Sequence, residues 1–428
     1  MNALKLLSTS SIVLGVSFVL RFALTVTLAK YLTSSELGVY SWAVTAFGIA
    51  GIVTNFGLDF FLIRKVPEYR DISLGMVSAV IKNTQKQSIK IAFVLILIIF
   101  SLSYFSIYIF EGAAIYRNEL MLIIFALPFA AISLIYSTSL RAFDFPLKGQ
   151  FIESIIQTGF LLIVILIFSN IFIDLIPTNK RTIAFVCIFF LSWVFSSLIS
   201  FFFFKKSVKL IPPLPPSKVS IKEWRGDQLS IVTGILGWSF LGRSDIFLLA
   251  FLVSPSEVGA YFICLRLAEI LMFFQTVAYY VWGGEISNLI HQNKLNQAQS
   301  ILKKSSQLCI STTLAMTCFA FIFAEDILFL VNERYVESAY LFKIALVTFF
   351  IKGASGMMKP LYYILGEQDF LAKCQWTIGL FFTTSVLITV PIYGLIACIT
   401  SFAVCEFIYL IILLVRLNNK HNLSLSPL

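Results

Sequence analysis

The chain has 428 residues, of which 59% are hydrophobic and only 13% are charged, and its formal net charge is +10. A soluble globular domain carries about 25% charged residues, so this composition excludes a water-soluble protein. In a soluble protein the positive charge would suggest nucleic acid. Here the charge lies in loops between apolar segments, which favours a role in membrane orientation instead.

The apolar segments recur from one end of the chain to the other, and each is close to the roughly 20 residues that cross a bilayer core. The first follows a single lysine, Lys5, and is too long for a signal peptide, so we interpret it as a retained span. Backbone groups in lipid must be satisfied internally, so we expect helices. The twelve predicted spans cover residues 11–32, 37–63, 89–110, 120–140, 151–173, 182–204, 228–253, 258–286, 305–331, 338–365, 371–391 and 394–416.

Proline residues divide the chain into two halves. The stretch IPPLPP, within residues 205–227, cannot be helical and is expected to form a stiff linker. Most lysines and arginines lie on the side that holds both termini and this linker, so the positive-inside rule places both termini in the cytoplasm. The prediction is an all-α polytopic membrane protein with a six-helix bundle at 1–204, a cytoplasmic linker at 205–227, a second six-helix bundle at 228–416 and a cytoplasmic tail at 417–428.

The two halves share a pair of short motifs in the same order. YLTSSELGVY (Tyr31 to Tyr40) matches LVSPSEVGAY (Leu252 to Tyr261), and GVSFVLR (Gly15 to Arg21) matches GWSFLGR (Gly237 to Arg243). Two ordered matches indicate a duplicated unit. Because each unit has six spans, the repeats run parallel and are related by a pseudo-two-fold axis along the membrane normal. In the turn itself, Ser and Glu suit a helix start and Gly allows close approach, so a ligand-free structural turn is expected.

Arg21 and Arg243 occupy equivalent positions of the repeat, well inside their spans, where an unpaired cation is costly. They fit either structural salt bridges between helices or a cationic cavity that binds an anion. Arg266 and Glu269 are three residues apart, which favours a local ion pair. Lys352 and Lys359 lie seven apart on one helix face, beside Gly353, Gly356 and Pro360, which can bend that helix. Of these cations, Arg21, Arg243 and Lys352 are therefore the candidates for a cationic cavity.

The sequence gives no sign of a cofactor or a metal site. Its seven cysteines form no C-x-x-C pair and fall in apolar segments, where they serve as small packing residues. GWSFLGRS (Gly237 to Ser244) has the spacing of a phosphate-binding loop, but it has arginine in place of lysine and lies inside a predicted span. No other ATP-binding pattern occurs, so any transport is expected to use ion gradients or the membrane potential.

Several of these motifs together resemble a known family. G-x-S-F-x-x-R, L-A-x-x-L, S-E-x-G-x-Y and NFGLD followed by RK at Asn55 to Lys65, with SDIFLL and EVGAYFICLRL in the second half, resemble the O-antigen and exopolysaccharide flippases. These form the polysaccharide transporter family of the multidrug/oligosaccharidyl-lipid/polysaccharide exporter superfamily. The resemblance covers essentially the whole chain and implies two six-helix bundles that face a central cavity.

The resemblance also implies a substrate and a mechanism. The substrate would be an oligosaccharide on undecaprenyl pyrophosphate, moved by alternating access from the cytoplasmic to the periplasmic leaflet of a bacterial inner membrane. A pyrophosphate head group needs cations in a water-filled cavity, and the candidates are Arg21, Arg243, Arg266 and Lys352. The candidates for proton or sodium coupling are Asp59, Asp245 and Glu269. Implied partners are membrane lipid, a proton or sodium ion, and other glycan-assembly proteins. Aromatic candidates for sugar stacking are Trp42, Trp238 and Tyr280. The sugar itself, the coupling ion and the oligomeric state are not encoded in any recognisable pattern.

Other functions remain open at this stage. An ion-coupled multidrug exporter of the same superfamily is the main alternative, although its typical cationic substrates suit an acidic cavity better than the basic one expected here. The peptidoglycan-precursor flippases typically have two further spans. A glycan polymerase or ligase commonly needs a large periplasmic loop, and the predicted periplasmic loops are short, so we do not expect an enzyme. Channel and scaffold functions also remain.

Overall fold

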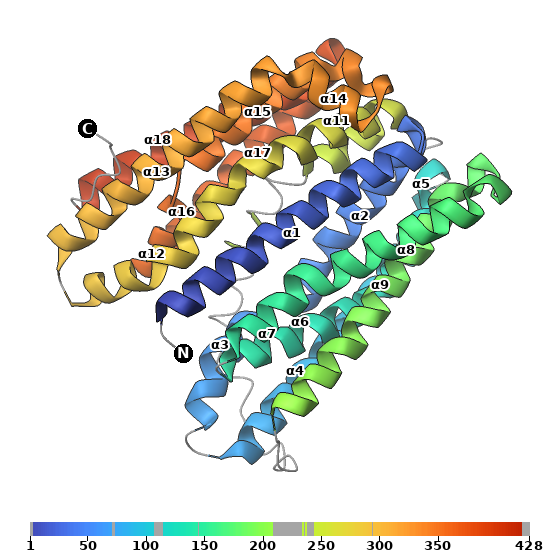
Figure 1. The fold of residues 1–428 in the computed structure, drawn as a ribbon. Helices are drawn as coiled ribbons and strands as arrows, with labels where there is room; N and C mark the ends of the chain where they lie inside the picture. The colour runs from blue at the N-terminus through green and yellow to red at the C-terminus, as the bar shows by residue number, and fades with distance from the viewer. Residues whose placement is uncertain are drawn as a thin grey trace.

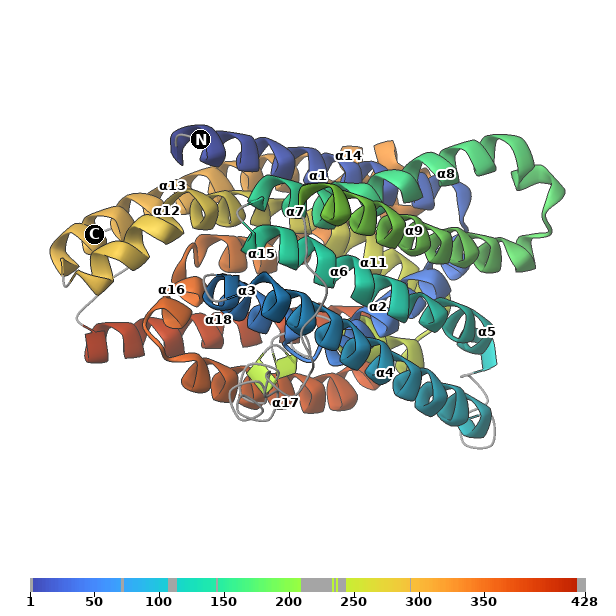
Figure 2. The same ribbon diagram turned by 90° about the horizontal axis from the view of Figure 1, so that it is seen from below.

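The computed structural model describes residues 3–70, 73–106, 114–143, 145–208, 233–234, 236–237, 244–292 and 294–421. These parts of the chain contain helices and no strand. Figure 1 shows the helices from α2 to α9 on one side and those from α11 to α18 on the other, with α1 along their boundary. Turned by 90°, the long helices of both groups still run along a common direction, as spans of one bilayer do (Figure 2).

The first half contains α1 to α9. The helices are α1 (Ala3–Tyr31), α2 (Ser34–Asn55), α3 (Leu58–Arg70), α4 (Leu74–Ser106), α5 (Ala114–Ile123), η2 (Ile124–Ala126), α6 (Leu127–Ala142), α7 (Pro146–Phe151), the π-helical turn η3 (Ile152–Ile156), α8 (Gln157–Phe172), η4 (Ile173–Leu175) and α9 (Thr178–Ser207). Several of these join end to end, so that α5, η2 and α6 form one rod, as do α7, η3 and α8.

The second half contains α11 to α18. Residues 244–252 are helical. They are followed by α11 (Pro255–Ala268), η7 (Glu269–Met272), α12 (Phe273–His291), α13 (Leu295–Ile322), α14 (Ala324–Val331), η8 (Glu333–Ser338), α15 (Ala339–Ala354), α16 (Met358–Ile364), α17 (Gln368–Tyr393) and α18 (Leu395–His421).

Ten helical segments among the described residues are long and apolar enough to cross a membrane. The rod formed by α11, η7 and α12 covers the span predicted at 258–286, and residues 244–252 belong to the span predicted at 228–253. The predicted all-α fold of twelve spans in two bundles is therefore confirmed. Of the linker predicted at 205–227, only residues 205–208 are among the described residues. Trp238 and Arg243 lie outside them.

Two predicted spans differ in detail from the structure. The span predicted at 37–63 is broken, because Phe56 (φ 43°) and Gly57 (φ 68°) adopt left-handed conformations between α2 and α3. The span predicted from residue 89 begins much earlier, since α4 starts at Leu74. The N-terminal half of α4 contains Lys82, Lys86 and Lys90. Lysine favours helix but is not apolar, so a search for apolar runs misses this part of the helix.

The bend predicted in the tenth span is present. Helix α15 ends at Ala354, Gly356 has a φ of +53°, and α16 starts two residues later at Met358. Pro360 lies in the first turn of α16, where its missing N–H is tolerated. The glycine thus supplies the left-handed residue that turns the chain between two helices.

The two repeated turns meet at the interface of the bundles. Helix α2 packs against α11 more extensively than any other two described elements pack together. Each begins with a capping box, formed by Thr33 with Glu36 and by Ser254 with Glu257. The serine expected to cap each helix was the one next to the glutamate, Ser35 or Ser256, and that expectation was wrong, because the N-caps are Thr33 and Ser254, three residues before each glutamate. The expected place of Glu36 and Glu257 in the first turn is confirmed. Helix α1 contacts both bundles, through α8 in its own half and α12 in the other.

Candidate functional site

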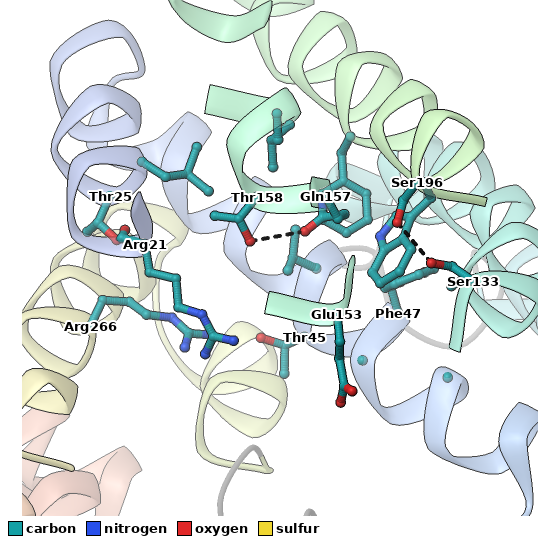
Figure 3. A pocket seen from close by; sticks show the side chains of 18 of the residues that line it. Arg21, Thr25, Thr45, Phe47, Ser133, Glu153, Gln157, Thr158, Ser196 and Arg266 are labelled. Atoms are coloured by element: carbon teal, nitrogen blue, oxygen red, sulfur yellow. Dashed lines mark hydrogen bonds between the residues drawn. The ribbon is translucent and has the colours of Figure 1, made fainter. Parts of the chain in front are cut away.

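A cavity of about 510 Å³ lies where the two halves meet. Most of its lining comes from α1, α2, α6, η3, α8 and α9 of the first half, and the second half contributes the end of α11 and η7. Figure 3 shows the cavity from close by. Its charged and polar side chains are Arg21, Thr25, Tyr40, Thr45, Asn55, Ser133, Ser137, Glu153, Gln157, Thr158, Trp193, Ser196, Arg266 and Glu269.

One end of the cavity is positively charged, and we call it the cationic end. Arg21 from α1 and Arg266 from α11 lie beside each other with their guanidinium groups in the same region (Figure 3). The Arg266 Nη1 atom lies 2.6 Å from Glu269 Oε2, so the predicted local ion pair is confirmed. No carboxylate within the described chain lies at ion-pair distance from Arg21. Two arginines and one glutamate leave this end with one excess positive charge.

The other end is lined by neutral polar and aromatic side chains, and we call it the hydroxyl end. Ser133 Oγ on α6 lies 2.8 Å from Ser196 Oγ on α9. Gln157 Nε2, at the start of α8, donates to Ser192 Oγ over 2.9 Å. The rings of Phe47 and Trp193 lie beside these groups, with centroids 5.8 Å apart.

Glu153 lies between the two ends (Figure 3). It belongs to the π-helical turn η3, which interrupts the α7–α8 rod. Its Oε2 atom is 3.0 Å from Arg141 Nη2. The charge of Glu153 is therefore compensated within the first half, and the cation excess at Arg21 and Arg266 is not cancelled by it.

The sequence of the first half and of the start of the second matches a known family. Residues 4–272 match the model of the family described as "Polysaccharide biosynthesis protein". The chain belongs to the polysaccharide biosynthesis protein family. The resemblance found in the motifs is confirmed by this match. Among curated proteins, none matches the sequence closely enough to count as a relative.

Solved structures of membrane transporters share the fold of this family member. A structure described as the inward-facing conformation of a multidrug resistance MATE family transporter of the MOP superfamily aligns with a TM-score of 0.76 at 11% identity, over 96% of this chain and 99% of that one. The MATE multidrug transporter DinF-BH aligns with a TM-score of 0.67 at 14% identity, over 98% and 95%. A MOP superfamily transporter from Pyrococcus furiosus, described as having a binding pocket of reverse polarity, aligns with a TM-score of 0.65 at 12% identity, over 96% and 93%.

Of the residues singled out in the sequence, three meet in this cavity: Arg21, Arg266 and Glu269. Lys352 does not line it. The Lys352 Nζ atom lies 3.5 Å from Glu406 Oε1, and Lys359 Nζ lies 3.6 Å from Glu406 Oε2, so the two lysines share one buried carboxylate. Their seven-residue spacing keeps both on the side that faces α18, even though the chain turns at Gly356 between them.

The remaining acidic candidates lie elsewhere. Asp245 is buried in the second half, where Tyr261 Oη donates to its Oδ2 over 3.1 Å and the Ile246 amide donates to its Oδ1 over 2.7 Å. Asp59 is in the first turn of α3 and does not line the cavity. Arg243 is outside the described residues.

The aromatic residues expected to stack on a sugar, as far as the structure describes them, do not line this cavity. Trp42 packs between the bundles, where its Nε1 donates to the Phe247 carbonyl over 3.3 Å and its ring stacks on Phe247. Tyr280 is on α12 and does not line the cavity. The aromatic residues that line the cavity are instead Phe18, Phe22, Tyr40, Phe47, Phe189, Trp193 and Phe262, and the sequence singled out none of them for sugar stacking. One sequence feature could have indicated the polar end of the cavity: both α6 and α9 contain several serines within an otherwise apolar helix. Serines in membrane-spanning helices are enriched where helices pack together, which favours an inward-facing position.

Proposed function

We propose that this protein is a flippase for an oligosaccharide carried on a polyprenyl pyrophosphate, such as an O-antigen or related repeat unit. The observation that carries the proposal is the meeting of Arg21 and Arg266, from opposite halves, in one cavity at the bundle interface. Guanidinium groups bind phosphate oxygens through paired, charge-assisted hydrogen bonds. A site built from both halves holds its ligand where relative movement of the bundles exposes it first to one leaflet and then to the other.

The cation excess supports an anionic substrate over a cationic drug. Glu269 neutralises one arginine at most, and Glu153 is paired with Arg141. An ion-coupled multidrug exporter is the alternative, because two of the similar structures are described as multidrug transporters. Typical drug substrates are cations, and Arg21 would repel them because it carries the same charge.

The direction of transport follows from the proposed orientation. With both termini in the cytoplasm of a bacterial inner membrane, the α1–α2 end of the bundles is periplasmic, and the bundles contact each other there. A membrane potential negative inside favours outward movement of an anion by about 2.3 kcal/mol per charge per 100 mV. The lipid chain stays in the bilayer while the head group crosses through the cavity.

Ion coupling is assigned to Glu269 ahead of Asp245 and Asp59. Glu269 is the acid that contacts a cavity arginine, so its occupancy by a proton or a sodium ion would release Arg266 for the substrate. Asp245 and Asp59 do not line the cavity and are secondary candidates for this role, as Arg243 and Lys352 are for substrate binding. Other glycan-assembly proteins are proposed partners on either side of the transport step.

Surface polysaccharide in a deletion strain tests the proposal. The strain carries wild type, Arg21→Ala, Arg266→Ala, the two Arg→Lys variants, or the control Lys373→Ala, which removes an exposed cation of α17. We expect loss of polymer with both alanine variants at normal membrane levels, partial recovery with lysine, and wild-type polymer with the control. Unchanged polymer in both alanine variants contradicts the cationic-site proposal, and raised drug sensitivity with intact polymer in the deletion strain favours the exporter.

A further inference from the structure

We propose that the hydroxyl end of the cavity is a subsite for the sugar next to the pyrophosphate. Trp193 and Ser196 at this end, and Glu153 at its border with the cationic end, would be the residues that distinguish one sugar from another. This inference rests on the proposed function and adds to it a second site of different chemistry. It starts from polar atoms that lack partners.

Two buried polar atoms of the lining have no hydrogen-bond partner within the described chain. They are Nε1 of Trp193, which can only donate, and Oδ1 of Asn55, which can only accept. Buried polar groups are nearly always paired, so an unpaired donor and an unpaired acceptor in one cavity indicate a polar ligand. A purely apolar drug would leave both atoms unpaired.

The neighbouring groups suit a molecule that carries many hydroxyls. Ser133 Oγ bridges Ser196 Oγ and Ser200 Oγ at 2.8 and 2.9 Å. Thr158 Oγ1 donates to Gln157 Oε1 over 3.4 Å. A hydroxyl is both donor and acceptor and rotates to suit its partner, so such a network accommodates sugar hydroxyls by re-orienting rather than by breaking.

The aromatic rings beside this network provide an apolar wall. Phe47 and Trp193 lie with their ring centroids 5.8 Å apart, and Phe189 contacts both of them. A ligand site that combines aromatic side chains with a few placed polar groups fixes orientation through the polar groups and gains contact area from the rings. A sugar ring has hydroxyls on its edge and C–H groups on its faces, and it matches both features.

The charge of this end suits a neutral group. Glu153 is the only carboxylate that lines the cavity apart from Glu269, as far as the chain is described, and its Oε2 lies 3.0 Å from Arg141. This compensation removes the reason for a cation to bind here, while the carboxylate oxygens still accept hydrogen bonds. Single π-turns inside helices occur frequently at functional sites. The turn η3 carries Glu153 and directly precedes Gln157 and Thr158, the first two residues of α8.

The order of the two ends matches the order of groups in the proposed substrate. Arg21 and Arg266 lie at one end, Glu153 lies between, and Ser133 and Ser196 lie farthest from Arg21 (Figure 3). Pyrophosphate and first sugar would follow each other in the same sequence. Phe22, which follows Arg21 on α1, lines the cavity and is 41% exposed, so it offers an apolar contact for the lipid chain.

Binding to the purified full-length protein in lipid nanodiscs tests this subsite. The probes are undecaprenyl pyrophosphate and the same lipid bearing a single N-acetylglucosamine or a single galactose. The variants are Trp193→Phe, which keeps a ring but removes the unpaired N–H, Ser196→Ala, and Arg266→Ala. The matched control is Trp282→Phe on α12, outside the cavity.

We expect wild type to bind one sugar-bearing lipid more tightly than the bare lipid. Trp193→Phe and Ser196→Ala should reduce that preference about tenfold, a change of about 1.4 kcal/mol, and leave the bare lipid unaffected. Arg266→Ala should weaken all three probes. Equal wild-type affinity for the three probes, or equal weakening of all three by Trp193→Phe, overturns the subsite while the pyrophosphate site stands. If Arg266→Ala changes none of them, the proposed function itself fails.

Discussion

Gly38 and Gly259 face each other across the contact between the two bundles, at the same position of the repeated turn. A Cβ atom on either glycine would lie 3.1 Å from the backbone nitrogen of the other. It would also overlap a carbonyl oxygen of the opposite half, that of Pro255 for Gly38 and that of Ser34 for Gly259. The motif is repeated because the two copies form one symmetric contact, in which each glycine lets a backbone of the other half approach.

Replacing either glycine with alanine should open this contact. The overlapping atoms belong to backbone carbonyls, which cannot rotate away as a side chain can. We expect Gly38→Ala and Gly259→Ala to separate the bundles at the α1–α2 end. Spin labels at the exposed positions Ser35 and Ser256 would report a longer distance than in wild type. Gly284→Ala is the control, because a Cβ there meets no atom within 4 Å. An unchanged distance distribution in both turn variants would show that the contact is not tight.

Arg334 closes the same end from a different element. Its Nη1 donates to the Leu32 carbonyl over 3.1 Å, and Asn332 Nδ2 donates to the Ala29 carbonyl over 3.3 Å. These carbonyls end α1, so the second half caps a helix of the first. We expect Arg334→Ala to shift the same spin-label distance toward separation and Arg334→Lys to restore part of the contact.

Arg334→Ala should destabilise the contact between the two bundles by about 1 kcal/mol, because the hydrogen bonds of Arg334 are charge-assisted but partly exposed to solvent. Arg181→Ala provides the comparison. Arg181 Nη2 also donates to a carbonyl, that of Ile173 at 3.4 Å, but within its own half. Its loss should leave the distance between the bundles unaltered. Equal responses from the two variants would argue against a specific role of Arg334 in closure.

The spans, the repeat and the acidic helix starts could be predicted from the sequence because each depends on local pattern. Backbone groups in lipid must be hydrogen-bonded within a helix, so hydropathy indicates the spans directly. The capping residues Thr33 and Ser254 were missed, because they lie before the shared S-E-x-G-x-Y pattern, although each is three residues from its glutamate, the spacing of a capping box. The break at Phe56 was not predictable in this way, since a bulky residue with positive φ depends on its tertiary surroundings.

The sequence could predict which cations lie inside spans, but not which of them are paired with a carboxylate. Hydropathy identifies Arg21 and Lys352 equally as cations inside spans, and only the fold shows which of them is neutralised. Lys352 meets Glu406, far along the chain on α18, whereas Arg21 meets a second arginine. The hydroxyl end was missed because serines in an apolar helix give little signal until neighbouring helices bring them together, as with Ser133 and Ser196.

The Lys352–Glu406–Lys359 cluster should respond unequally to loss of its members. The side chains are 12%, 4% and 16% exposed, so the cluster is buried with one excess positive charge. Glu406→Gln leaves two buried lysines without a counter-charge and should cost about 3–5 kcal/mol of folding stability. Lys352→Met leaves a neutral Lys359–Glu406 pair and should cost much less. Thermal unfolding in detergent ranks the two variants, and a Lys352→Met protein less stable than Glu406→Gln would refute this charge assignment.

Glu269 should compete with the substrate for Arg266. The carboxylate lies 2.6 Å from the Arg266 guanidinium, so a phosphate oxygen must share or displace it. Glu269→Gln keeps the size of the side chain and removes its charge. We expect it to bind undecaprenyl pyrophosphate a few-fold more tightly than wild type, with a smaller gain at high salt, because both side chains are 36% exposed and screened there.

Transport by the Glu269→Gln variant should slow down, because a ligand that is held more tightly leaves more slowly. Binding titration together with the surface-polysaccharide assay separates the two effects, and the double variant Arg266→Ala/Glu269→Gln is the control. If Glu269 acts only through Arg266, the double variant binds as weakly as Arg266→Ala alone. An independent loss of affinity on removing Glu269 would mean that the carboxylate contacts the substrate itself.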